Sequence, residues 1–174
     1  MYRLKKNGLR ILKVFHLVAA SCWLGGAISL MTLNLNSPAV TAEGMLYGIN
    51  TASHFIDMWV IGVIGVLGCL ITGILYGTFT VWGFFQYKWI IWKWALTAAA
   101  LISAMLFLAP GVEVIIELSR ELGNSALYDE TYLAIKNSHL FWGLIQVTLL
   151  LLMVIFSVFK PWGKRKAKTS KTTP

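Results

Sequence analysis

Four stretches of this sequence are long and apolar enough to cross a lipid bilayer. The first has no Asp, Glu, Lys or Arg from Val14 to Leu33, and a helix of about 20 residues covers the ~30 Å hydrocarbon layer because each residue adds about 1.5 Å. The predicted spans are residues 11–35, 57–79, 89–110 and 139–160. They predict a single all-α domain over residues 1–163, folded as a transmembrane four-helix bundle.

The composition also indicates a membrane protein. Hydrophobic residues make up 57% of the 174-residue chain and charged residues only 13%, about half of the ~25% typical of soluble domains. The net charge of +8 does not point to a nucleic-acid partner, because the basic residues flank the apolar runs or fill the C-terminal segment. That segment, residues 164–174, is predicted to be a basic, disordered tail.

The distribution of Lys and Arg predicts the topology. The N-terminal lead, the connection over residues 80–93 and the tail are basic, whereas residues 36–57 contain no Lys or Arg. The connection over residues 111–139 carries five acidic residues against two basic ones. Since cytoplasmic loops are enriched in Lys and Arg, we expect both termini to be cytoplasmic.

Polar residues near the predicted outer ends of the spans offer two kinds of binding site. Two neutral imidazoles from different helices can ligate a b-type haem, which makes His54 and His139 candidate axial ligands. Arg120 and Lys136 are the outer basic residues available to pair with the haem propionates. A carboxylate-rich alternative is a copper or other divalent-metal site, and its candidate ligands are His54, Asp57, Glu113, Glu117 and His139. The third interpretation is that these residues lie at the headgroup boundary and bind no cofactor.

The predicted inner layer contains His16 and Lys93. Ionisable residues at lipid depth normally face the bundle interior, so His16 either lines a functional cavity or hydrogen-bonds a neighbouring helix. Trp23 lies two turns further along the same helical stripe, where a flat cofactor would fit. Lys93 either extends to the inner headgroups or neutralises an acidic substituent near His16.

The segment from His16 to Gly26, with the pattern His-x6-Trp-x-Gly-Gly, resembles the first helix of copper-resistance-D-like bacterial membrane proteins and of related uncharacterised integral membrane families. The segment from Thr80 to Thr97 is similar to the junction between the second and third helices of such four-span proteins. The resemblance implies a bacterial plasma-membrane protein with a role in copper handling or haem chemistry. It singles out four residues for testing: His16, Trp23, Asp57 and Lys93. The chain departs from the longer copper-resistance proteins because it has only four spans and no methionine-rich external segment.

Three functional hypotheses follow, and the sequence does not assign an enzymatic activity. The first is a b-type haem-binding or membrane redox protein; the second is a protein that transports or handles copper or another divalent cation. The third is a non-catalytic assembly subunit without a cofactor, whose small-residue seams pack against a membrane partner or a second copy: Gly62, Gly65 and Gly73, and Ala19 and Gly26. In each case the lipid bilayer is the expected environment.

Overall fold

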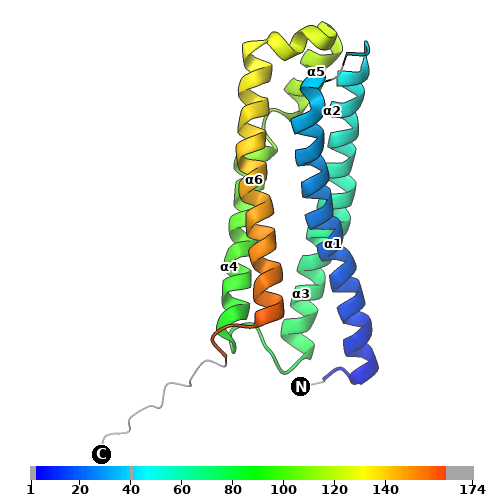
Figure 1. Ribbon diagram of the computed structural model, residues 1–174. Helices are drawn as coiled ribbons and strands as arrows, with labels where there is room; N and C mark the ends of the chain where they lie inside the picture. The colour runs from blue at the N-terminus through cyan, green and yellow to red at the C-terminus, as the bar shows by residue number, and fades with distance from the viewer. Residues whose placement is uncertain (1–2, 40, 164–174) are drawn as a thin grey trace, which may run out of the picture.

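The computed structural model describes residues 3–39 and 41–163, which form helices joined by short connections (Figure 1). Two segments, η2 and η3, are π-helical, and two, η1 and η4, are 3-10 helices. The elements in chain order are α1 (Lys6–Asn36), η1 (Ser37–Ala39), α2 (Met45–Phe55), η2 (Ile56–Leu67), α3 (Gly68–Phe79), α4 (Lys88–Ser103), η3 (Ala104–Leu108), α5 (Val112–Leu122), η4 (Gly123–Tyr128) and α6 (Glu130–Phe159).

These elements combine into four long helical units, which confirms the predicted all-α architecture. The units are Lys6–Ala39, Met45–Phe79, Lys88–Tyr128 and Glu130–Phe159, and each is long and apolar enough to span a membrane. Large apolar side chains are exposed along the flank of the bundle, including Phe15 at 63% and Val158 at 69%. A protein of this kind belongs in a membrane, because lipid is the solvent that accepts such a surface. The predicted tail, residues 164–174, lies outside the described residues.

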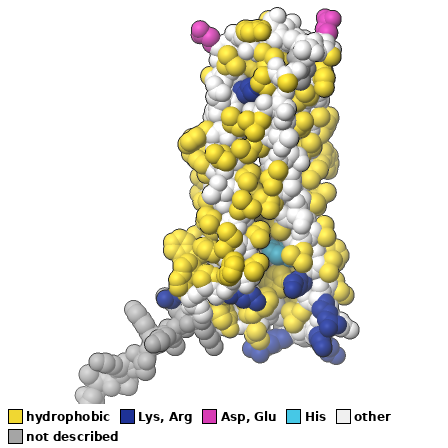
Figure 2. Space-filling model, viewed as in Figure 1, with side chains coloured by type: hydrophobic (Ala, Val, Ile, Leu, Met, Phe, Trp, Pro, Cys, Tyr) yellow, Lys and Arg dark blue, Asp and Glu magenta, His cyan; other side chains and the backbone are white. Residues whose placement is uncertain are grey.

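The two ends of the bundle carry opposite charge. The described chain begins and ends at the same end (Figure 1), where Lys and Arg side chains gather (Figure 2). We call this the basic end; its residues include Lys5, Lys6, Lys88 and Lys160. The opposite, acidic end carries Glu43, Glu121, Asp129 and Glu130.

Helix α1 lies at the centre of the packing. It contacts η2 and α3 on one side and α6 on the other, α6 in turn packs against α4, and α5 crosses to contact α2 near the acidic end. The contact between α1 and η2 is very close, since a Cβ added at Gly65 would lie 2.8 Å from Cα of Trp23. A Cβ at Gly26 would lie 2.5 Å from Cγ1 of Ile61. Two of the predicted small-residue positions, Gly65 and Gly26, therefore pack against helices of this same chain.

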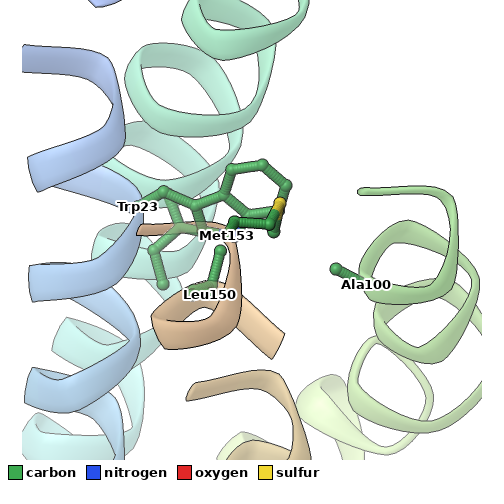
Figure 3. Close-up of a cluster of buried hydrophobic side chains, with 5 residues drawn as sticks. Trp23, Ala100, Leu150 and Met153 are labelled. Atoms are coloured by element: carbon green, nitrogen blue, oxygen red, sulfur yellow. The ribbon is translucent and has the colours of Figure 1, made fainter. Parts of the chain in front are cut away.

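A cluster of buried side chains joins all four units at mid-bundle. Trp23, Ile61, Ala100, Leu150 and Met153 form this core. Figure 3 shows Trp23, Leu150 and Met153 close together, with Ala100 facing them from α4. A second cluster near the acidic end, formed by Leu46, Ile115, Ala126 and Tyr132, holds α5 and η4 against α2 and α6.

The third unit breaks at Pro110 and Gly111. Proline has no amide hydrogen to continue the helical ladder, and Gly111 has a φ of +88°, a conformation that glycine adopts without strain. A new helix, α5, begins at Val112 and ends before Gly123, where φ is +55°. This break turns α5 toward α2 and leaves the carbonyl group of Pro110 free to accept a hydrogen bond from another helix.

Candidate functional site

A cavity of about 280 Å³ lies inside the bundle, in the half nearer the acidic end. All four helical units line it, and both π-helical segments contribute side chains, among them Asp57 and Ile61 from η2 and Leu108 from η3. Its polar lining residues are Asn34, Ser37, Asn50, Ser53, His54, Asp57, Tyr132, Lys136, His139 and Gln146. Small-molecule pockets usually measure about 300–1,000 Å³, so this cavity is near the lower limit for a binding site.

The cavity is long. Along the first unit it is lined by residues spaced three and four apart on α1, from Trp23 near the bundle centre, and by Ser37 at the start of η1. Trp23 and Ser37 are separated by about four helical turns, or about 21 Å at 1.5 Å per residue.

The structure brings together three of the predicted site residues. His54 and Asp57 reach the cavity from the second unit, and His139 reaches it from α6. Nε2 of His139 lies 3.0 Å from the carbonyl oxygen of Pro110. Because a carbonyl only accepts hydrogen bonds, Nε2 carries the proton in the neutral ring, and Nδ1 is the nitrogen with a free lone pair.

Lys136 is a buried cation in the cavity wall. Its residue is only 8% exposed, and Nζ donates a hydrogen bond of 2.7 Å to the hydroxyl of Ser37. Within residues 3–39 and 41–163, no carboxylate lies within 4 Å of Nζ, and the ion pair found is between Arg120 and Glu117. An ammonium group has three hydrogens, so Lys136 can donate further hydrogen bonds to a molecule in the cavity.

Two other polar atoms of the lining residues have no hydrogen-bond partner among the described residues. They are Nε1 of Trp23 and Oδ1 of Asn34. Trp23 is only 3% exposed, and its indole nitrogen is a donor. Burying a donor without a partner costs about 1–3 kcal/mol, which a polar ligand or water at that position would recover.

The predicted inner residues make hydrogen bonds between helices and do not line this cavity. The Thr72 hydroxyl donates to the Gly68 carbonyl at 2.6 Å, so it accepts from Nδ1 of His16, 2.7 Å away. The ring of His16 also meets Tyr76 edge-on, with centroids 5.6 Å apart. Lys93 donates to the hydroxyl of Ser157 at 2.8 Å. Trp23, predicted on the same stripe as His16, lies in the core and the cavity wall instead.

Helix α5 carries the remaining predicted site residues on its surface. Glu113, Glu117 and Arg120 are exposed, and Arg120 forms an ion pair with Glu117 of its own helix. None of the three lines the cavity. They are separate from His54, Asp57 and His139 because the break at Pro110 and Gly111 rotates α5 relative to α4.

The geometry of the cavity limits how the predicted cofactors could bind. In the described part of the chain, no group of three or more His, Cys, Asp or Glu side chains is close enough to hold a metal ion. A haem between His54 and His139 would use Nδ1 of His139 or break the hydrogen bond to Pro110. Of the two predicted propionate partners, Lys136 lines the cavity and Arg120 does not. The residues present therefore do not fit a bis-histidine haem without rearrangement.

Several cavity residues were absent from the predicted site. They include Asn34, Asn50, Tyr132 and Gln146. On α6 the positions Tyr132, Lys136, His139, Gly143 and Gln146 repeat at intervals of four and three, which places them on one helix face. That spacing is visible in the sequence and would have added Tyr132 and Gln146 to the site once His139 was placed inside the bundle.

Comparisons of the chain with protein-family models, with curated proteins and with solved structures find no match. The resemblance to copper-resistance-D-like proteins therefore stays a prediction. The fold and the cavity define the class of protein: a bundle of four helices able to span a membrane, with a largely apolar internal cavity in one half whose wall also carries polar and charged side chains.

Proposed function

We propose that this protein binds a small molecule in the cavity between its four helices. The observation that carries the proposal is that His54, Asp57, Lys136 and His139 line one cavity between the helices. Polar residues inside an apolar bundle are costly unless they are paired, and they characteristically mark binding sites and pathways. No catalytic step is part of this proposal.

The test is the chemical accessibility of the cavity. Gly143 and Gly25 each have open space where a Cβ would be, but Gly143 lines the cavity while Gly25 lies on the exposed face of α1. In a Cys22→Ala/Cys69→Ala background, we expect Gly143→Cys to react with N-ethylmaleimide at least several times faster than Gly25→Cys. A thiol in a polar cavity ionises and reacts, whereas a thiol facing lipid does not. Equal rates, or a slower reaction at position 143, would reject an accessible polar cavity.

We further propose that the protein lies in a bacterial plasma membrane with both termini cytoplasmic. The separation of charge supports this topology, because Lys and Arg collect at the end of the bundle where the described chain begins and ends. The cavity then lies in the outer half of the membrane. A green fluorescent protein fused to the C-terminus would fluoresce in this topology, and alkaline phosphatase fused there would be inactive. The reverse pattern would contradict it.

Haem b is a second candidate, because His54 and His139 lie in the wall of one cavity, but its binding would require the ring of His139 to use Nδ1 or to give up its hydrogen bond to Pro110. When bound, haem would supply one-electron redox chemistry, with imidazole ligands from α2 and α6. An absorption spectrum of the protein, purified from cells given a haem precursor, tests this candidate. A Soret band that His54→Ala and His139→Ala both remove would establish haem. A spectrum without absorption bands above about 380 nm would exclude haem as the ligand and leave the proposal of another small molecule in place.

A further inference from the structure

We infer that the ligand of the cavity is a single-chain amphiphile with an anionic head, such as a free fatty acid, whose head binds Lys136 and whose chain extends toward Trp23. This inference rests on the proposed small-molecule function and names the chemical class of the ligand. Three features of the cavity carry it: its length, the position of its unpaired cation, and the mostly apolar wall toward the bundle centre.

The length and lining of the cavity favour an extended hydrocarbon chain. The lining runs about 21 Å along the first unit, at 1.5 Å per residue. Toward the bundle centre most of the lining residues are apolar, among them Ile61, Val66 and Leu101, and the side chain of Gln146 there already accepts a hydrogen bond from Ser103. Hydrocarbon surface buried there gains about 25 cal/mol per Å² relative to water.

The charge favours an anion at the other end of the cavity. Lys136 and its partner Ser37 lie near the acidic end, and no carboxylate within the described residues is within 4 Å of the ammonium group. A buried charge without a counter-ion is costly, and an anionic ligand removes that cost. Ligand oxygens can accept the ammonium hydrogens that Ser37 leaves unused.

Asp57 also lines the cavity, but at a different depth. Lys136 is less than two turns from the start of α6, whereas Asp57 is more than three turns from the start of α2. Since both helices start at the acidic end, the two charges differ in depth by about 9 Å at 1.5 Å per residue. Asp57 therefore leaves the surroundings of Lys136 open to an anion, and it faces the level of His54 and His139 instead.

Photolabelling tests the inference in phosphatidylcholine nanodiscs. The probes are a 16-carbon fatty acid carrying a diazirine and an alkyne in its chain, and the matched alcohol. We expect the acid to label peptides that contain the deep lining residues Leu30 and Leu101, and excess palmitate, but not methyl palmitate, to compete. Lys136→Met is expected to lower labelling by the acid about tenfold, the size of one charged hydrogen bond. Lys88→Met, which removes an exposed lysine at the basic end, serves as the matched control and is expected to leave labelling unchanged.

The outcomes separate the inference from the proposed function. If acid and alcohol label the cavity peptides equally, and Lys136→Met changes neither, the cavity binds amphiphiles without selecting an anion and the inference is overturned. If neither probe labels those peptides while both label the lipid-facing surface, the chain-shaped ligand is rejected, and the accessibility of Gly143→Cys then decides the proposed function independently. Should Lys136→Met fail to fold, competition by palmitate against methyl palmitate on the unmodified protein still decides whether the charge matters.

Discussion

Nε2 of His139 donates a hydrogen bond of 3.0 Å to the carbonyl of Pro110, across the break in the third helical unit. The interruption of the helix at Gly111 takes this carbonyl out of regular helical pairing, and a histidine on α6 supplies a donor. The bond ties the start of α5 to α6 and fixes the orientation of a ring that also lines the cavity.

His139→Ala is expected to loosen this connection. Losing one hydrogen bond and leaving a carbonyl unpaired predicts a decrease of about 1–2 kcal/mol in the free energy of unfolding. Hydrogen–deuterium exchange should rise locally over residues 108–115, since the break loses its external support. His139→Gln can still donate to the carbonyl and serves as the control. Unchanged exchange in the alanine variant would show that the hydrogen bond does not hold α5 in place.

Gly65→Ala is expected to separate α1 from η2. The added methyl group would lie 2.8 Å from Cα of Trp23, so backbone atoms have to move, at a cost of about 1–3 kcal/mol. Gly25→Ala is the matched control, because it adds the same methyl group to an open face of α1. Thermal unfolding in detergent compares the two variants. The close packing would be refuted by a Gly65→Ala protein as stable as Gly25→Ala.

Thr72→Val is expected to leave the ring of His16 without its partner on α3. The substitution keeps the shape but removes the hydroxyl that accepts from Nδ1, which predicts a loss of about 1–3 kcal/mol. Thr78→Val is a control on the same helix, since that hydroxyl bonds only the carbonyl of Ile74. Melting temperatures measure the difference. Equal shifts for the two variants would mean that the bond between helices adds nothing.

Ser157→Ala is expected to remove the hydrogen-bond partner of the Lys93 amine. Lys93 donates to this hydroxyl across the α4–α6 contact, and loss of a hydrogen bond to a charged group predicts about 1.5–3 kcal/mol of destabilisation. Thr148→Ala provides the comparison on α6, where the hydroxyl bonds its own helix at Leu144. Chemical denaturation in mild detergent gives the values. A smaller effect for Ser157→Ala than for Thr148→Ala would contradict the role assigned to this contact.

The four helical units were predictable because lipid imposes a simple requirement on sequence. In a chain with so few charged residues, a long apolar run such as Val14–Leu33 has few alternatives to forming a membrane-spanning helix. The units extend beyond the predicted spans at Met45 and at Glu130. Helical pairing continues there past the apolar residues, and Asp129 caps α6 by accepting from the amide of Tyr132 at 2.9 Å.

The candidate site was predictable only in part. The shared helix end brought His54 and His139 to similar depth, and helical spacing joined Asp57 to His54. The rotation of α5 after Pro110 could not be derived from spacing, so Glu113 and Glu117 were grouped with residues that they do not approach. Lys136 can be buried because its amine donates a hydrogen bond to Ser37, which is distant in the sequence. No local sequence pattern contains this tertiary contact.

The seam between Trp23 and Gly65 also determines which wall of the cavity is stiff. Because the backbones of α1 and η2 are in direct contact, these two segments are expected to move together as a rigid unit. The opposite wall is formed by Leu101, Ala104 and Leu108 of a helix that is interrupted a few residues later, at Pro110 and Gly111. The wall on that side is therefore expected to deform more readily than the wall formed by α1 and η2 when a ligand binds.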